Sequence, residues 1–145
     1  MRKTVAVAII SLLVSSVGFA DTIINEKFST DPLQNGWQIF GDRNLFQWDS
    51  TNQALGVTWD SSQTNSYFYH PLGRTFTQAD SFCVGFDLNL TDTAATGYFQ
   101  LAIGLCNFAE ATSPDFSRAN GYSPDICEFD YYPDGPDSYG PSLDS

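Results

Sequence analysis

Alternation of apolar and polar residues is the main pattern of this chain after residue 20, and the apolar spacing of an amphipathic helix is nearly absent. The clearest alternation runs from Ser81 to Leu90. The same pattern predicts further strands at Thr22 to Phe28, Trp37 to Phe40, Phe46 to Asp49, Leu55 to Trp59, Tyr67 to His70, Gly97 to Phe108 and Ile126 to Tyr132. Strands with one apolar and one polar side are typical of antiparallel sheets that pack on one face only.

Short groups of turn residues separate the predicted strands, for example Gln34-Asn35-Gly36 and Pro71-Leu72-Gly73. Several short strands with such turns favour an all-β antiparallel β-sandwich or a barrel. From residue 132 to 145 the chain becomes an acidic loop or tail rich in Pro and Gly, and no closing strand is predicted there. Two interpretations stay open: a fragment of a longer protein whose last strands are missing, or a natural disordered tail.

The first 20 residues have the three parts of a secretory signal peptide. Arg2 and Lys3 are basic, Thr4 to Val17 form an apolar stretch, and Gly18-Phe19-Ala20 supplies small residues for cleavage. The stretch is short for a membrane span, which takes about 20 apolar residues, and an uncleaved N-terminal anchor is the alternative. We therefore expect one mature domain over residues 21–145, secreted or held at the cell surface or in the periplasm, without membrane insertion.

The charge of the predicted mature chain limits its partners. Four basic residues stand against 17 acidic ones, a formal charge of −13. A nucleic-acid binder needs a basic surface to neutralise phosphates, so nucleic acid is excluded, and anionic lipid is disfavoured for the same reason. Neutral glycans and divalent cations remain compatible, and a solvated acidic surface explains the charge without any partner.

Three cysteines remain after residue 20: Cys83, Cys106 and Cys127. In an oxidising compartment two of them can pair, which leaves one over. Their spacing fits no zinc site, since there is no Cys-x-x-Cys pair and His70 is the only histidine.

Two carboxylates on one predicted strand form the main candidate metal site. Glu128 and Asp130 are two residues apart on the strand, so they share a face at a separation of roughly 7 Å. Calcium takes six to eight oxygens, and it would relieve their mutual repulsion. Asp134, Asp137 and the carbonyl of Tyr132 follow as further oxygen ligands. The alternative is a solvated acidic strand beside an Asp-rich turn.

Glu128-Phe129-Asp130, followed by Tyr131-Tyr132, Asp134 and Asp137, resembles the metal-binding strand and loop of legume-type lectins. More broadly, the chain resembles the concanavalin A-like lectin/glucanase group, and residues 25–37 resemble the first strand of its secreted bacterial modules. The resemblance implies a jelly-roll sandwich in which Glu128, Asp130, Tyr132, Asp134 and Asp137 hold calcium. The lectin loop has Asn at position 134 and a later metal-binding His, and this chain has neither, so a second metal is not implied.

The same resemblance raises an enzyme alternative. Retaining glycosidases use two carboxyl groups about 5–5.5 Å apart, and family 16 enzymes place them in a Glu-x-Asp-x-(x)-Glu strand. Here the position of the second Glu holds Tyr132 or Pro133, so we expect no catalysis of this kind. No Gly-x-Ser-x-Gly motif indicates a serine hydrolase either.

Aromatic residues are the candidates for sugar contact, because sugar C–H faces stack on aromatic rings. Tyr67 and Tyr69 share one side of a predicted strand, and Tyr132 follows the acidic strand. Trp48 and Trp59 alternate in phase with apolar neighbours, which predicts core positions for both. His70, before a proline, is interpreted as a strand-end residue rather than a ligand-binding one.

These observations together predict an exported, calcium-dependent carbohydrate-binding or adhesive β-sandwich whose partner is a glycan or a cell-surface polysaccharide. One alternative is a glycoside hydrolase or lyase of the same fold whose second catalytic residue lies beyond Ser145. The other is a structural cell-surface module without a small ligand.

Overall fold

The computed structural model describes residues 3–12, 24–59, 65–77, 79–90, 101–116, 125–131 and 142–144, with the backbone alone for residues 3–12, 59, 101, 131 and 142–144. Strands predominate in these ranges, as the alternation predicted. The helical elements are two short 3-10 helices, η1 (Pro32–Asn35) and η2 (Arg43–Leu45), and one four-residue α-helix, α1 (Phe108–Ala111). The chain divides into two compact units, residues 1–92 and 93–145, which are described separately.

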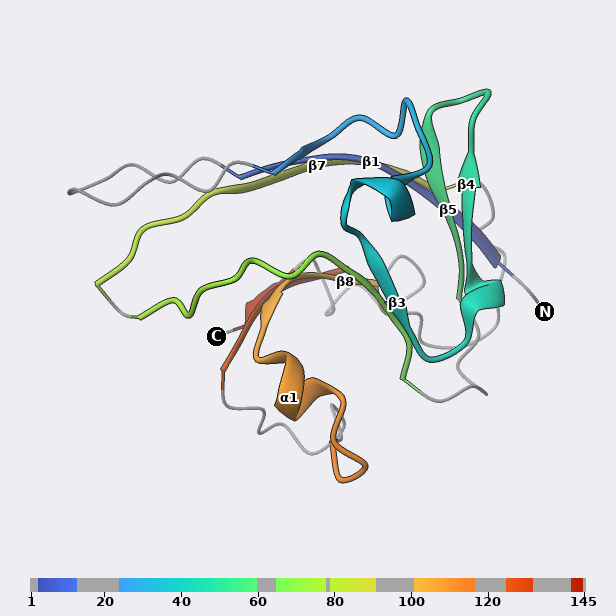
Figure 1. Ribbon diagram of the computed structural model, residues 1–145. Helices are drawn as coiled ribbons and strands as arrows, with labels where there is room; N and C mark the ends of the chain where they lie inside the picture. The colour runs from blue at the N-terminus through green and yellow to red at the C-terminus, as the bar shows by residue number, and fades with distance from the viewer. Residues whose placement is uncertain are drawn as a thin grey trace. The chain divides into compact units, whose positions relative to one another are not determined.

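The first unit contains a five-stranded antiparallel sheet (Figure 1). Strand β1 (Lys3–Leu12) pairs with β5 (Ala54–Trp59) on one side and with β7 (Val84–Leu90) on the other. Strand β2 (Asn25–Glu26) pairs with the end of β1, and β4 (Phe46–Asp49) pairs with β5. The prediction of strands in the segments that contain β4, β5 and β7 is therefore confirmed.

Residues 3–12 lie within the segment predicted to be a signal peptide. In the structure they form β1, the strand between β5 and β7. Removal of residues 1–20 stays a prediction about processing. Within the described ranges, no helix is long and apolar enough to cross a membrane.

A separate two-stranded ribbon joins β3 (Gln38–Phe40) to β6 (Tyr67–Tyr69), with Ile39 opposite Phe68. It begins directly after a tight turn. In that turn Asp31 accepts a hydrogen bond from the Leu33 N–H at 3.0 Å, and Gly36 at φ +93° ends the helix η1. This αL conformation suits glycine, which lacks the Cβ that makes it costly.

Among the described side chains of the first unit, the buried apolar ones are Phe28, Pro32, Trp37, Ala54 and Leu55. The core position predicted for Trp48 is wrong, because this side chain is 37% exposed. Its indole N–H donates a 2.8 Å hydrogen bond to the carbonyl of Phe28, and this polar requirement explains why the ring lies at the edge of the core. The side chain of Trp59 lies outside the described part of the structure.

The second unit is a three-stranded antiparallel sheet in the order β10–β9–β8 (β8, Leu101–Cys106; β9, Ile126–Tyr131; β10, Ser142–Asp144). The expectation of no closing strand after residue 132 is wrong, since β10 pairs with β9. Its three residues are too few to show an alternation. Cys127 stands opposite Leu105 and Cys106 opposite Ile126, so the two thiols belong to opposite faces, an arrangement that disfavours a disulfide between them.

Candidate functional site

The β3–β6 ribbon has two chemically different faces, because residues opposite each other in an antiparallel pair share a face. On one face the rings of Phe40 and Tyr67 are stacked with centroids 6.0 Å apart. On the same face the Tyr69 hydroxyl donates a 2.7 Å hydrogen bond to Gln38 Oε1. The structure therefore brings Tyr67 and Tyr69, two of the predicted sugar-contacting residues, onto one surface. The third, Tyr132, lies outside the described residues.

The other face of the ribbon contains the indole of Trp37. Trp37 stacks on Phe68 with ring centroids 4.9 Å apart and planes 12° from parallel. His70 meets the edge of the same indole at 5.5 Å and 85°. Trp37 is only 7% exposed. Its contacts with Phe68 and His70 hold the indole ring in one orientation.

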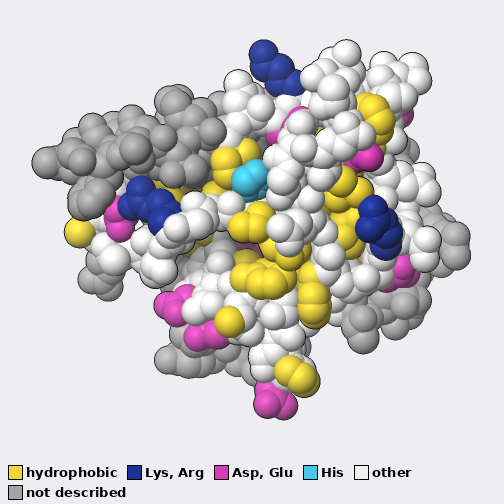
Figure 2. All heavy atoms as spheres, in the orientation of Figure 1, with side chains coloured by type: hydrophobic (Ala, Val, Ile, Leu, Met, Phe, Trp, Pro, Cys, Tyr) yellow, Lys and Arg dark blue, Asp and Glu magenta, His cyan; other side chains and the backbone are white. Residues whose placement is uncertain are grey.

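A cleft of about 450 Å³ opens beside Trp37 and His70. Figure 2 shows the His70 side chain, in cyan, reaching the surface among hydrophobic side chains. The volume lies within the range of about 300–1,000 Å³ typical of small-molecule sites. Its described lining comes from β2 and the preceding residue, from the end of η1 and the turn after it, and from the segment after β6: Ile24, Asn25, Glu26, Asn35, Trp37, His70, Pro71 and Leu72.

Glu26 is the carboxylate of this cleft, and it is 5% exposed. Its Oε1 accepts a 2.7 Å hydrogen bond from the backbone N–H of Phe28, and its Oε2 accepts a 3.2 Å hydrogen bond from Asn35 Nδ2. A buried carboxylate needs such donors, because losing water without replacement is costly. Two carboxylate oxygens offer about four acceptor positions, so Glu26 retains capacity for a ligand donor.

Phe28 and Asn35 are themselves held in place around Glu26. Phe28 has a left-handed backbone at φ +52°, an uncommon conformation for a residue with a side chain. Its N–H donates a hydrogen bond to Glu26, and its carbonyl accepts one from the Trp48 indole. These two hydrogen bonds stabilise the left-handed conformation of Phe28. Asn35 Nδ2 also donates to Thr30 Oγ1 at 3.1 Å. The amide oxygen of Asn35 therefore faces a fixed direction.

His70 links the two sides of the cleft. Its Nδ1 lies 2.9 Å from the Pro71 carbonyl oxygen and its Nε2 lies 3.3 Å from the Asn35 carbonyl oxygen. Carbonyl oxygens only accept, so each tautomer of a neutral imidazole satisfies one contact and the imidazolium satisfies both. Gly36 makes this approach possible, because a Cβ at that position would lie 2.9 Å from Nε2.

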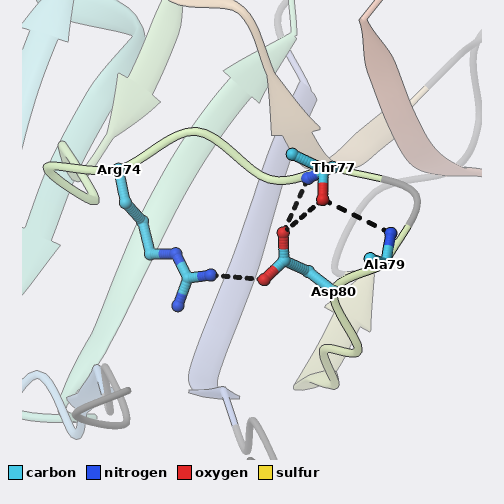
Figure 3. Close-up of polar contacts among 4 residues, drawn as sticks. All are labelled: Arg74, Thr77, Ala79 and Asp80. Atoms are coloured by element: carbon cyan, nitrogen blue, oxygen red, sulfur yellow. Dashed lines mark hydrogen bonds and ion pairs between the residues drawn. The ribbon is translucent and has the colours of Figure 1, made fainter. Parts of the chain in front are cut away.

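The loop that continues from the cleft to β7 is closed by an ion pair (Figure 3). Arg74 Nη2 lies 2.6 Å from Asp80 Oδ1, and the Thr77 N–H and hydroxyl donate to Asp80 Oδ2 at 2.8 and 2.9 Å. The Thr77 backbone N–H, with smaller contributions from the Thr77 hydroxyl and the Arg74 guanidinium, holds the pKa of Asp80 below its usual value. The Arg74 guanidinium also lies 4.7 Å from the centre of the Phe76 ring. These contacts anchor the loop that follows Pro71 and Leu72.

The predicted metal ligands Glu128 and Asp130 lie on one face of β9, in the second unit. Asp130 is 2% exposed, and Glu128 is half-buried. Gly104 of β8 stands opposite Glu128, and a Cβ on Gly104 would lie 2.8 Å from the Cβ of Glu128. Asp144 stands opposite Glu128 in the register of β10. Asp134 and Asp137 lie outside the described residues, as does Tyr132.

Among the residues that the structure describes, no group of three or more His, Cys, Asp or Glu side chains is arranged to hold a metal. Calcium requires six to eight oxygens, so the two described carboxylates would supply only part of a site. The remaining ligands of the predicted set belong to residues 132–137.

No protein-family model, no curated protein and no solved structure matches this chain. The candidate site therefore rests on its own geometry.

Neither Glu26 nor Asn35 was predicted from the sequence to be a site residue, and His70 was predicted to be a strand-end residue rather than a ligand-binding one. One signal was present for Glu26, which alternates in phase with Ile24 and Phe28 and so occupies a core position with a carboxylate. The role of Asn35 depends on a contact nine residues away, which no local pattern encodes.

Proposed function

We propose that this chain is an exported carbohydrate-binding module that holds its ligand in the Glu26–Trp37–His70 cleft. One observation carries the proposal: a single cleft of about 450 Å³ combines two aromatic side chains, a buried carboxylate and side-chain amides. Sugars present apolar C–H faces for rings and hydroxyls for polar groups, and binding sites combine these contacts in this way. The acidic net charge favours a neutral glycan.

Asn25 and Asn35 supply the hydroxyl recognition in this proposal. Both side chains are exposed, and both line the cleft. Asn35 uses its Nδ2 for Glu26 and Thr30, so its amide oxygen is the group that accepts from a ligand hydroxyl. Glu26 accepts a second hydroxyl through its remaining lone pairs. The edge of Trp37 and the ring of His70 form the apolar wall.

For the fold we propose a concanavalin A-like jelly-roll sandwich, supported by the series of short antiparallel strands and by the Glu128-Phe129-Asp130 motif. Calcium has a structural role in this proposal. Glu128 and Asp130 would hold it together with Tyr132, Asp134 and Asp137, and it would order the segment after β9.

A second binding surface is the face of the ribbon with Tyr67 and Tyr69. Its stacked Phe40–Tyr67 pair and the Tyr69–Gln38 hydrogen bond provide a ring platform with polar groups beside it. Hydrolysis is the less favoured function for the cleft, because Glu26 is the one carboxylate among the lining residues that the structure describes and glycosidases need two.

The test is a titration of the full chain with soluble neutral oligosaccharides. Binding is detected from changes in the NMR signals of the Asn side-chain amides and the Trp37 indole. We expect Asn25→Ala to weaken binding about five- to tenfold, the effect of one lost hydrogen bond. Lys27→Ala, at an exposed position outside the described lining of the cleft, is the control and should leave affinity unchanged. Weakening by Tyr69→Phe alone would move the site to the tyrosine face, and absence of binding by any oligosaccharide would refute the proposal.

A further inference from the structure

Strand β1 occupies a position with neighbours on both sides (Figure 1). Val5, Ala6 and Val7 pair with β5 and with β7 at the same time. Farther along, Ile10 stands opposite Glu26 of β2. Neither β5 nor β7 pairs with the other among the described strands, so β1 alone joins them into one sheet.

The residues of β1 are also those of the predicted signal peptide. Cleavage after Ala20 would remove the strand and leave the edges of β5 and β7 without it. Their N–H and C=O groups would then face an open position one strand wide. Unpaired strand edges of this kind attract other extended chains.

We propose that the processed chain takes up an extended peptide strand from a partner protein between β5 and β7, in the position of β1. This inference rests on the proposed removal of residues 1–20, and it concerns the edges of β5 and β7 rather than the cleft. Main-chain hydrogen bonds to the two edges supply the affinity, and alternate side chains supply the specificity, as in other cases of strand addition.

The register defines the chemistry of the partner strand. At the position of Val5 the neighbours are Val57 and Leu90, and at the position of Val7 they are Leu55 and Leu88. These positions accept large apolar residues.

The intervening position, Ala6, lies between Gly56 and Asn89, and Ala8 lies opposite Asp87. Asn89 and Asp87 are exposed, so these positions accept polar or small residues. The partner is therefore a strand that alternates large apolar residues with polar or small ones and runs antiparallel to β5 and β7.

The experiment places a specific protease site between Ala20 and Asp21 of the full chain and cuts after folding. A labelled peptide with the sequence of residues 3–12 is then added. We expect saturable binding to the cut chain once residues 1–20 are removed, and none to the uncut chain. Amide hydrogen exchange at alternate residues of β5 and of β7, those whose N–H groups bond to β1, should speed up on removal and slow again with the peptide.

A control peptide carries Val5→Pro and Ala6→Pro. Successive residues of a central strand bond to opposite neighbours, so these prolines remove donors on both sides. We expect its affinity to be at least about tenfold lower, the effect of two lost hydrogen bonds. If the cut chain unfolds, the unmodified peptide should restore its fold.

Three results would overturn the inference: persistent protection of β5 and β7 after removal without peptide, equal binding of the proline peptide, or failure of the peptide to bind or to restore the fold. Sugar titration of the uncut chain reports separately on the cleft. A failure of one proposal is thereby distinguished from a failure of the other.

Discussion

The carboxylate of Glu26 accepts a 3.2 Å hydrogen bond from the side-chain amide of Asn35, nine residues later in the chain. This contact joins strand β2 to the last residue of η1, and it places two lining groups of the cleft side by side. The other oxygen of Glu26 binds the N–H of Phe28, the most buried apolar residue of the core. The same carboxylate thus connects the core of the first unit to the candidate binding site.

Replacement of Glu26 should destabilise the fold in a graded way. Glu26→Ala leaves the Phe28 N–H and an Asn35 amide hydrogen without their acceptor in a buried place, so we expect a loss of about 2 kcal/mol or more in the free energy of unfolding. Glu26→Gln keeps one acceptor oxygen and should cost about 1 kcal/mol. Urea unfolding measures both. The neighbouring exposed Lys27→Ala should stay within about 0.5 kcal/mol of the parent, and a similarly small effect of Glu26→Ala would contradict this prediction.

Gly36 and Gly73 form a matched pair for testing the His70 contact. Both have positive φ, +93° and +67°, but a Cβ at Gly36 would lie 2.9 Å from His70 Nε2 and a Cβ at Gly73 would meet no atom within 4 Å. Gly73→Ala should therefore cost only the backbone strain, about 1–2 kcal/mol. Gly36→Ala should cost more and should also displace His70.

A double mutant isolates the steric part of the Gly36 effect. With His70→Ala present, Gly36→Ala should cost no more than Gly73→Ala, since the contact that it disturbs is gone. Thermal unfolding of the four variants gives the coupling free energy. A coupling of zero would show that His70 does not lie against Gly36.

The local alternation was sufficient to predict most strands. Phe46–Asp49 and Ile126–Tyr131 form strands close to the predicted bounds, because every second side chain of a strand meets the same environment. Strand β10 was missed because Ser142–Asp144 is too short to alternate, and its pairing with β9 determines it. The strand at residues 3–12 was missed because the same apolar run satisfies the signal-peptide pattern.

The cleft could be predicted only in part. Trp37 was predicted only as the start of a strand, and Glu26 and Asn35 acquire their roles from hydrogen bonds between separate segments. Trp48 shows the opposite failure. Its place in the alternation predicted a buried side chain. The indole N–H instead donates to the Phe28 carbonyl at the edge of the core, and local periodicity does not reveal such a contact.

Gly104 should be intolerant of any side chain. A Cβ there would overlap the Cys127 carbonyl oxygen and approach Glu128 Cβ to 2.8 Å, so β8 would have to move away from β9. We expect Gly104→Ala to cost about 2–3 kcal/mol, as overpacking does in close-packed regions. Gly56→Ala is the control in another strand, where the nearest atom would be the Gln47 oxygen at 3.3 Å. Equal unfolding midpoints in urea for the two variants would refute the tight β8–β9 approach.

Asp80 should contribute to stability above its own pKa and lose that contribution in acid. The Thr77 backbone N–H is the main cause that lowers its pKa in the folded chain, followed by the Thr77 hydroxyl. The unfolded chain has the usual value of about 3.9, so the stabilisation is fully present above that pH and disappears as the pH falls through the lower folded value. Asp80→Asn should remove this part of the acid dependence.

The measurement for Asp80 is an NMR titration of its carboxyl group together with thermal unfolding between neutral and acid pH. The substitution Thr77→Ala removes the hydroxyl but keeps the backbone donor, so the folded pKa of Asp80 should rise only partway toward its usual value. A folded pKa at or above the usual value in the parent chain would contradict the loop geometry of Figure 3.

Calcium should stabilise the full chain if Glu128 and Asp130 belong to a metal site. A ligand that binds only the folded state adds about 2.7 kcal/mol at one hundred times its Kd. We therefore expect the melting temperature to rise with calcium and to fall back with chelator. Asp130→Asn destabilises the chain in either condition because Asp130 is buried, so the informative quantity is the difference between the two conditions for each variant. That difference should vanish for Asp130→Asn and persist for Asp87→Asn, an exposed position on β7. A parent chain with the same melting temperature in calcium and in chelator would refute the metal site and leave Glu128 and Asp130 as structural carboxylates of β9.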